Sequence, residues 1–311
     1  MPTEGFSAEI RERALDLAWS LWAELGVSGW RRHHQDWGID PEPLVIFTAS
    51  IADLDPRLRD ESLDWCIRFG HYLSRARLRN LLRGEDDRTV SSFGTYSATV
   101  NAHSTLNWPG STNPLPYQPT GRSDIRDFTA PALLALRLRA LLGVSARAEA
   151  VRLLMAARAP LATSDIAGEI DYTKRNVADA LESLRLAGVV FSERHRNAMH
   201  HRLNRTDLRG VATPLPKLFP AWKPIFRVIS GLLVVEARQE ALSKAARAVE
   251  ARRVVESLKG ALEAASLRRP DLTVVGEDFW QAFSNWATET MTGLAFAESS
   301  RVFDRDREPT Y

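Results

Sequence analysis

The stretch from Ala146 to Asn204 constrains the fold more than any other part of the sequence. It contains three short amphipathic helical patterns, followed by two strand-like runs on either side of a polar tip. The first helix is expected over residues 148–157. The second is expected to start near Thr163, whose hydroxyl can act as an N-cap. Its apolar positions recur every three to four residues, at Ile166, Ala167 and Ile170.

The third helical pattern has well-marked ends. Asp171 and Tyr172 interrupt the second pattern, and Thr173 stands where the cap of a new helix belongs. Gly188 is expected to end this helix, because glycine adopts positive φ at little cost. The apolar stripe at i, i+4 and i+7 consists of Val177, Leu181 and Leu184. The helix is therefore expected to bury this stripe and to expose its opposite face.

The exposed face of the third helix has the chemistry of a DNA reader. At about 100° per residue, burial of the apolar stripe leaves a polar face, basic at its amino end. Arg and Lys suit guanine O6 and N7, Asn suits adenine, and a helix amino terminus favours phosphate. A helix that serves only for packing gains little from such a start. The side chains expected at a DNA surface are Thr173, Lys174, Arg175, Asn176 and Asp179.

Two strands are expected after Gly188, around a basic tip at residues 194–197. Such a hairpin suits the neighbouring minor groove or the phosphates, and forms a wing beside the reading helix. The side chains expected to hold the DNA backbone are Ser164, Arg194, Arg196 and Arg202.

The segment LATSDIAGEIDYTKRNVADALESLRLAGVV, residues 161–190, resembles the winged helix-turn-helix of MarR-like and ArsR-like bacterial transcriptional regulators. The resemblance implies that the second and third helices form the helix-turn-helix and that the third reads double-stranded DNA. Two residues depart from the pattern. Asp171 stands where such turns often carry glycine, and it adds negative charge near the expected DNA face. Gly168 lies inside a helix, at a cost of about 1 kcal/mol relative to alanine.

A second interpretation stays open, because winged helices also bind proteins. From residue 145 to 205, ten Arg and Lys oppose seven Asp and Glu, which is a modest basic excess. The chain is accordingly interpreted as a DNA-binding transcriptional regulator. The alternative is an antitoxin-like or scaffold protein whose winged helix binds a protein partner. The aromatic residues of the first ninety positions would suit either a small-molecule effector site or such a partner.

Composition limits the other classes. The net charge is only +2, so any affinity for DNA must come from local clusters. A single cysteine, Cys66, excludes an internal disulfide and a cysteine-rich zinc site. Nucleotide-binding and hydrolase motifs are absent from the sequence, so no enzymatic activity, cofactor or metal is expected. With neither a signal peptide nor a membrane span in the sequence, a cytoplasmic protein is expected.

The predicted fold is mainly α, with the winged helix flanked by N- and C-terminal helical regions. The expected ranges are a helical region at 1–90, an aromatic-containing polar loop or linker at 91–130, the winged helix at 131–210 and a helical region at 211–311. The arginine-rich helix at 75–83 is expected to have a solvated face, or otherwise to make a second phosphate contact or form a surface for a partner protein. The leucine-rich helix after Pro131 is assigned to the scaffold or to the interface of a homodimer.

Overall fold

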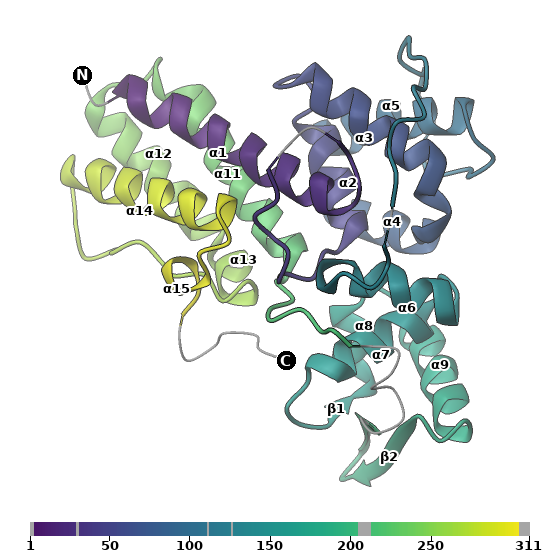
Figure 1. Ribbon diagram of the computed structural model, residues 1–311. Helices are drawn as coiled ribbons and strands as arrows, with labels where there is room; N and C mark the ends of the chain where they lie inside the picture. Colours follow the sequence, from purple (N-terminus) through teal and green to yellow (C-terminus); the bar gives the residue numbers. More distant parts are fainter. Residues whose placement is uncertain (1–2, 29–30, 111, 126, 205–212, 305–311) are drawn as a thin grey trace. The chain divides into compact units, whose positions relative to one another are not determined.

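The computed structural model describes residues 3–28, 31–110, 112–125, 127–204 and 213–304. It is mainly helical, with one three-stranded antiparallel sheet (Figure 1). The chain divides into two compact units. Unit 1 comprises residues 1–23, 30–34 and 220–308, and unit 2 comprises residues 24–29, 35–219 and 309–311. None of the helices in the described ranges combines the length and the apolar character that a membrane span requires.

Unit 1 is built from helices of both ends of the chain. Its elements are α1 (Thr3–Glu24), α11 (Trp222–Gln239), α12 (Lys244–Ser257), α13 (Lys259–Ala264), α14 (Asp278–Ala295) and α15 (Ser299–Val302). The core is aromatic, and Phe6 of α1 meets Trp280 of α14 edge to face at 5.3 Å between ring centres. The Nε of Arg11 donates to the carboxylate of Glu236 at 2.9 Å, which ties α1 to α11.

A buried histidine also holds unit 1 together. The Nε2 of His34 lies 2.8 Å from the carbonyl oxygen of Leu294, and its Nδ1 lies 2.8 Å from the hydroxyl of Ser20. A carbonyl can only accept, so Nε2 carries the proton and Nδ1 accepts from Ser20. Burial lowers the pKa of His34 to about 4.

Acid is therefore expected to destabilise unit 1 in a defined pH window. The unfolded chain protonates His34 near its ordinary pKa of 6.5, whereas the folded chain does so only near 4. The stabilisation is complete above pH 6.5 and is lost as the pH falls to about 4, by about 3 kcal/mol in total. Denaturant unfolding at pH 7 and pH 5 measures this. The variant His34→Gln should flatten the pH dependence of the free energy of unfolding, and the neighbouring variant His33→Gln should not. If both variants show the same pH dependence, His34 is not the group responsible.

The first part of unit 2 consists of four α-helices and a short 3₁₀ turn. They are α2 (Pro41–Ser50), α3 (Pro56–Phe69), η1 (Gly70–Tyr72), α4 (Arg75–Leu82) and α5 (Asp87–Ala102). The predicted caps are present, because Asp55 accepts the amides of Arg57 and Leu58, and Ser74 accepts the amide of Arg77.

The predicted loop at 91–130 is wrong over its first part, because α5 runs through it to Ala102. The prediction rested on the polar composition of this segment and overlooked the spacing of Phe93, Tyr96 and Val100, which are all buried. The Oδ1 of Asp86 caps the helix by accepting the amide of Thr89 at 2.9 Å. The aromatic residues Phe93, Tyr96 and Trp108 of this segment are all buried.

The chain after α5 is held against the helices by Asp64 of α3. Its buried carboxylate accepts the amides of Thr120, Gly121 and Ser123 at 2.6 to 3.0 Å. Burial alone would raise the pKa of this carboxyl, but these hydrogen bonds lower it below its ordinary value. This segment is thus part of the compact unit and does not link separate domains. The predicted boundary between 210 and 211 lies outside the described residues.

The second part of unit 2 combines helices with the sheet. Its elements are η2 (Pro131–Leu133), α6 (Leu134–Leu142), α7 (Ala146–Ala156), β1 (Leu161–Ala162), α8 (Thr163–Glu169), α9 (Lys174–Leu186), β2 (Val190–His195) and β3 (Ala198–Leu203). The strand order is β1-β3-β2, and a two-residue turn joins β2 to β3. One apolar cluster buries residues of α6, α7, α8, α9 and the base of the hairpin. In Figure 1 the hairpin lies below α8 and α9. Most of α6 is buried in its own unit, which favours the scaffold assignment of this helix.

Replacing either of two glycines of this region by alanine should change the free energy of unfolding, but in opposite directions. Neither Gly168 nor Gly188 has an atom within 4 Å of the site of an added Cβ, so packing does not distinguish them. Gly188 has φ +75, which costs alanine about 1 kcal/mol or more, whereas Gly168 lies in α8 at ordinary helical φ. We expect Gly188→Ala to lower the free energy of unfolding by about 1 kcal/mol and Gly168→Ala to raise it by a similar amount. Thermal unfolding of both variants checks this, and shifts of the same sign would contradict it.

Candidate nucleic-acid interface

The amino end of α9 is exposed and carries a side-chain cap. Thr173 is its N-cap, and the threonine Oγ1 accepts the amide of Asn176 at 3.3 Å. This cap fixes the helix start, so that Lys174, Arg175 and Asn176 follow in the first turn, where all three are exposed. The predicted apolar stripe is buried on the opposite face: Val177, Leu181 and Leu184. The expected burial pattern of this helix is therefore confirmed.

The middle of the exposed face of α9 carries negative charge. Asp179 is exposed, and Glu182 accepts two hydrogen bonds of 2.7 Å from Arg185. Asn176 and Asp179 also line a groove of 390 Å³ between α9 and the starts of α4 and α7. Positive charge is thus concentrated in the first turn of the helix, where the helix dipole adds to it. An anionic partner would be attracted to that end.

The start of α8 differs from the prediction. Thr163 does not cap the helix, which begins at this residue without a side-chain cap. Its hydroxyl instead lies 2.9 Å from Nε2 of His201 in β3, whose Nδ1 lies 2.8 Å from the hydroxyl of Ser192 in β2. Burial lowers the pKa of His201, which favours its neutral ring. Ser164 is exposed in the first turn, and its hydroxyl donates to Asp165 at 3.1 Å.

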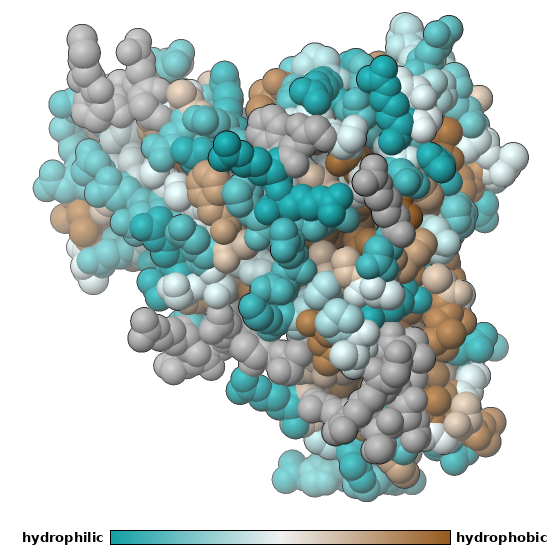
Figure 2. Space-filling view, viewed as in Figure 1, coloured by the Kyte–Doolittle hydropathy of each residue, from teal (hydrophilic) through white to brown (hydrophobic). Residues whose placement is uncertain are grey.

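The three arginines of the hairpin are exposed but do not share one face. Side chains alternate along a strand, so Arg194 lies on the same face as Val190, whereas Arg202 lies on the other. The guanidinium of Arg202 stands 5.0 Å from the centre of the Phe191 ring. Arg196 occupies the turn with φ +53. The end of the hairpin is predominantly hydrophilic in the space-filling view (Figure 2).

Asp171 lies in the turn between α8 and α9 and does not add free negative charge to the surface, contrary to expectation. Its carboxylate pairs with Arg77 of α4 at 3.6 Å, and its side chain is only 9% exposed. The residue has φ +55, the left-handed conformation that glycine would supply in such a turn. Asp171 thus adopts the conformation that glycine would supply, and its carboxylate pairs with Arg77 inside unit 2.

The local sequence pattern does not distinguish Arg77 from the other arginines of its helix. Arg75, Arg79 and Arg83 have the expected solvated face, but Arg77 on the same helix is 1% exposed. It belongs to a buried charge network whose members are Asp40, Glu42, Arg77, Arg139, Glu149 and Arg152. Glu42 lies 2.8 Å from both Arg77 and Arg139. Isolated charges inside apolar segments, such as Arg139 in the leucine-rich α6, are the signal that the sequence offers.

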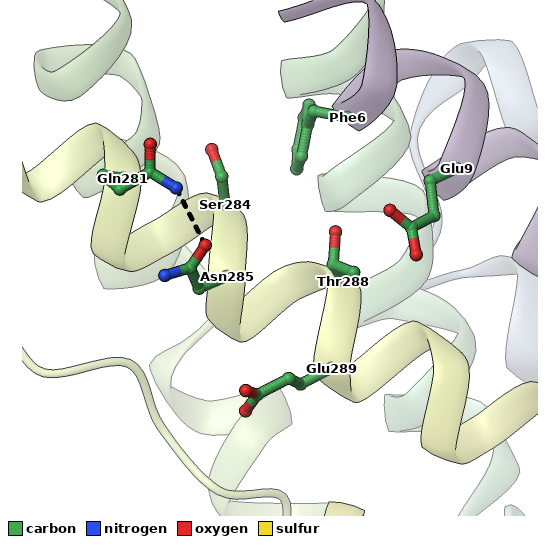
Figure 3. Close-up of a pocket in the computed structure, with 7 residues that line it drawn as sticks. All are labelled: Phe6, Glu9, Gln281, Ser284, Asn285, Thr288 and Glu289. Atoms are coloured by element: carbon green, nitrogen blue, oxygen red, sulfur yellow. Dashed lines mark hydrogen bonds between the residues drawn. The ribbon is translucent and has the colours of Figure 1, made fainter. Parts of the chain in front are cut away.

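Unit 1 contains a separate polar groove, of 310 Å³, between α1 and α14 (Figure 3). Its lining residues are Phe6, Glu9, Gln281, Ser284, Asn285, Thr288 and Glu289. Within it Gln281 donates to Asn285 at 2.8 Å. The two carboxylates give the groove a negative potential, so that it suits a cation better than an anion.

The chain matches no protein-family model, no curated protein and no solved structure. In the part of the chain that the structure describes, no three His, Cys, Asp or Glu side chains are grouped as metal ligands.

Proposed function

We propose that the chain is a DNA-binding transcriptional regulator in which α7, α8, α9 and the sheet form a winged helix-turn-helix. One observation carries the proposal: α9 buries its apolar stripe and presents an exposed, capped, basic first turn beside an exposed hairpin. A helix of this kind fits the major groove, and a basic hairpin fits the adjoining backbone or minor groove.

The proposed contacts follow from the chemistry of each side chain. Lys174, Arg175 and Asn176 would meet base edges, with Thr173 near a phosphate. Asp179, one turn further along the exposed face, would accept from the amino group of cytosine. The residues proposed to contact the DNA backbone are Ser164, Arg194, Arg196 and Arg202. Because Arg194 and Arg202 lie on opposite faces of the hairpin, they would contact different phosphates.

We further propose that two copies bind together. A homodimer would place its two α9 helices about 34 Å apart on a pseudo-palindromic site. Footprinting would then show two protected half-sites one helical turn apart, whereas a single half-site would contradict the dimer.

Selection of bound fragments from random double-stranded DNA tests the proposal and yields the target at the same time. Recovery of one enriched sequence, with affinity that falls steeply as salt rises, is the expected result. Absence of enrichment at low salt would contradict the proposal.

The alternative, an antitoxin-like or scaffold protein, has one observation in its favour. Leu186, in the last turn of α9, is 73% exposed, and two carboxylates, Asp179 and Glu182, share the exposed face. Charge and apolar area of this kind suit a protein partner. Co-purification of a stoichiometric protein without nucleic acid would favour this function.

A further inference from the structure

Helix α4 and its N-cap contact three consecutive residues of the turn that precedes α9. The Nε of Arg77 donates to the carbonyl of Ile170 at 3.1 Å. The amide nitrogen of the Asn80 side chain donates to the carbonyl of Asp171 at 2.8 Å. The hydroxyl of Tyr172 donates to the hydroxyl of Ser74, the N-cap of α4, at 2.7 Å. Three consecutive residues are thus held by one helix that is distant in sequence.

Arg77 is itself held in place by two buried carboxylates. Its guanidinium forms a bidentate pair with Asp40 and lies 2.8 Å from Glu42, and both partners are buried. An arginine held by two carboxylates at the start of α2 has little freedom to rotate. The position of the Ile170 carbonyl therefore depends on α2 as well as on α4.

The turn needs such support because of its own conformation. Asp171 has φ +55, which is uncommon for a residue other than glycine. Unfavourable conformations of this kind persist where the surrounding contacts determine them. Here those contacts are the pairing of the Asp171 carboxylate with Arg77 and the bond from Asn80 to its carbonyl.

We propose that α4 is a positioning helix for α9: through Arg77, Asn80 and Ser74 it fixes the α8–α9 turn, and thereby the direction in which α9 presents its first turn. The consequence for DNA rests on the proposed function. The helical region of α2 to α5 then takes part in recognition without touching DNA, and a displacement of α4 would weaken binding.

Hydrogen exchange and DNA affinity, measured on the full chain, test this. Asn80→Ala removes the bond to Asp171, and Tyr172→Phe removes only a hydroxyl. Arg79→Ala is the control, because Arg79 is exposed on the same helix. One hydrogen bond corresponds to a factor of roughly 2 to 12 in an equilibrium. In both test variants we expect the amides of Ile170, Asn176 and Val177 to exchange faster by a factor in this range. The affinity for the selected DNA should fall by a similar factor.

The outcomes separate the two proposals. Equal exchange in Asn80→Ala and Arg79→Ala would overturn the positioning role, whether or not the chain binds DNA. Faster exchange with unchanged DNA affinity would overturn it too, since α9 would then not depend on the turn. A wild-type chain that binds no DNA contradicts the proposed function alone, and the exchange measurement still decides whether α4 holds the turn. Melting temperatures of the three variants verify that each remains folded.

Discussion

Replacing Lys174 and Arg175 together by alanine is expected to reduce affinity for the selected DNA by about 30-fold or more. Each lost base contact costs about 1–3 kcal/mol, and the double variant would remove two of the proposed contacts. Both side chains are exposed in the first turn of α9, so their removal leaves the buried stripe intact. Fluorescence anisotropy with a labelled duplex, at fixed salt, measures the change.

The control must remove the same charge elsewhere. Lys244 and Lys259 are exposed in unit 1, and the double variant Lys244→Ala, Lys259→Ala lowers the net charge by the same two units. If affinity depends on the net charge alone, both double variants will lose it equally, and the assignment of α9 as the reading helix will be wrong. If α9 reads DNA, the control retains nearly all of its affinity.

The start and end of α9 were predictable because they depend on nearby residues. Thr173 caps a turn that contains Asn176, and Gly188 lies just beyond the last helical residue. Such signals act within one turn of helix, so the sequence alone contains them. The exposure of the basic first turn followed from the same periodicity.

Composition misled the prediction of α5. Serine and threonine are common in loops because their hydroxyls compete for backbone groups. In α5 the hydroxyl of Thr99 instead donates to the carbonyl of Thr95, one turn earlier, at 2.9 Å. The apolar residues Phe93, Tyr96 and Val100 supply the burial that stabilises the helix. Periodicity was the better guide here.

The support of the α8–α9 turn could not be predicted, because its partners are far apart in the chain. Arg77 and Ile170 are separated by 93 positions, and Arg77 and Asp40 by 37. An arginine in an arginine-rich helix has the same local pattern whether it is solvated, as Arg79 is, or buried. Only the tertiary structure shows which arginine faces the interior.

The second large effect is expected from Glu149→Gln, in the buried charge network. Glu149 accepts from the Nε of Arg139 at 2.8 Å and from the Nε of Arg152 at 2.9 Å, and all three residues are buried. Glutamine keeps the shape but removes the negative charge, so the two guanidinium groups lose a shared partner. Loss of one member of a buried ion pair costs about 3–5 kcal/mol. Denaturant unfolding, followed by a probe in unit 2, should show this loss.

The pH dependence gives a second measurement of the same contact. Burial alone would raise the pKa of Glu149, but attraction to Arg139 and Arg152 outweighs it and holds the pKa well below its ordinary value. A carboxyl with a lowered folded pKa stabilises the protein above its unfolded pKa, near 4.5, and this stabilisation is lost as the pH falls. Wild type should therefore lose stability in acid, and Glu149→Gln should lose less.

An exposed pair with the same spacing provides the matched control. Glu182 and Arg185 of α9 are three positions apart, as Glu149 and Arg152 are, and lie 2.7 Å from each other. Their side chains are 56% and 44% exposed, so water already solvates both charges. Glu182→Gln should leave the free energy of unfolding essentially unchanged, because exposed pairs contribute little. Equal effects of Glu149→Gln and Glu182→Gln would show that burial does not set the strength of the contacts of Glu149 with Arg139 and Arg152.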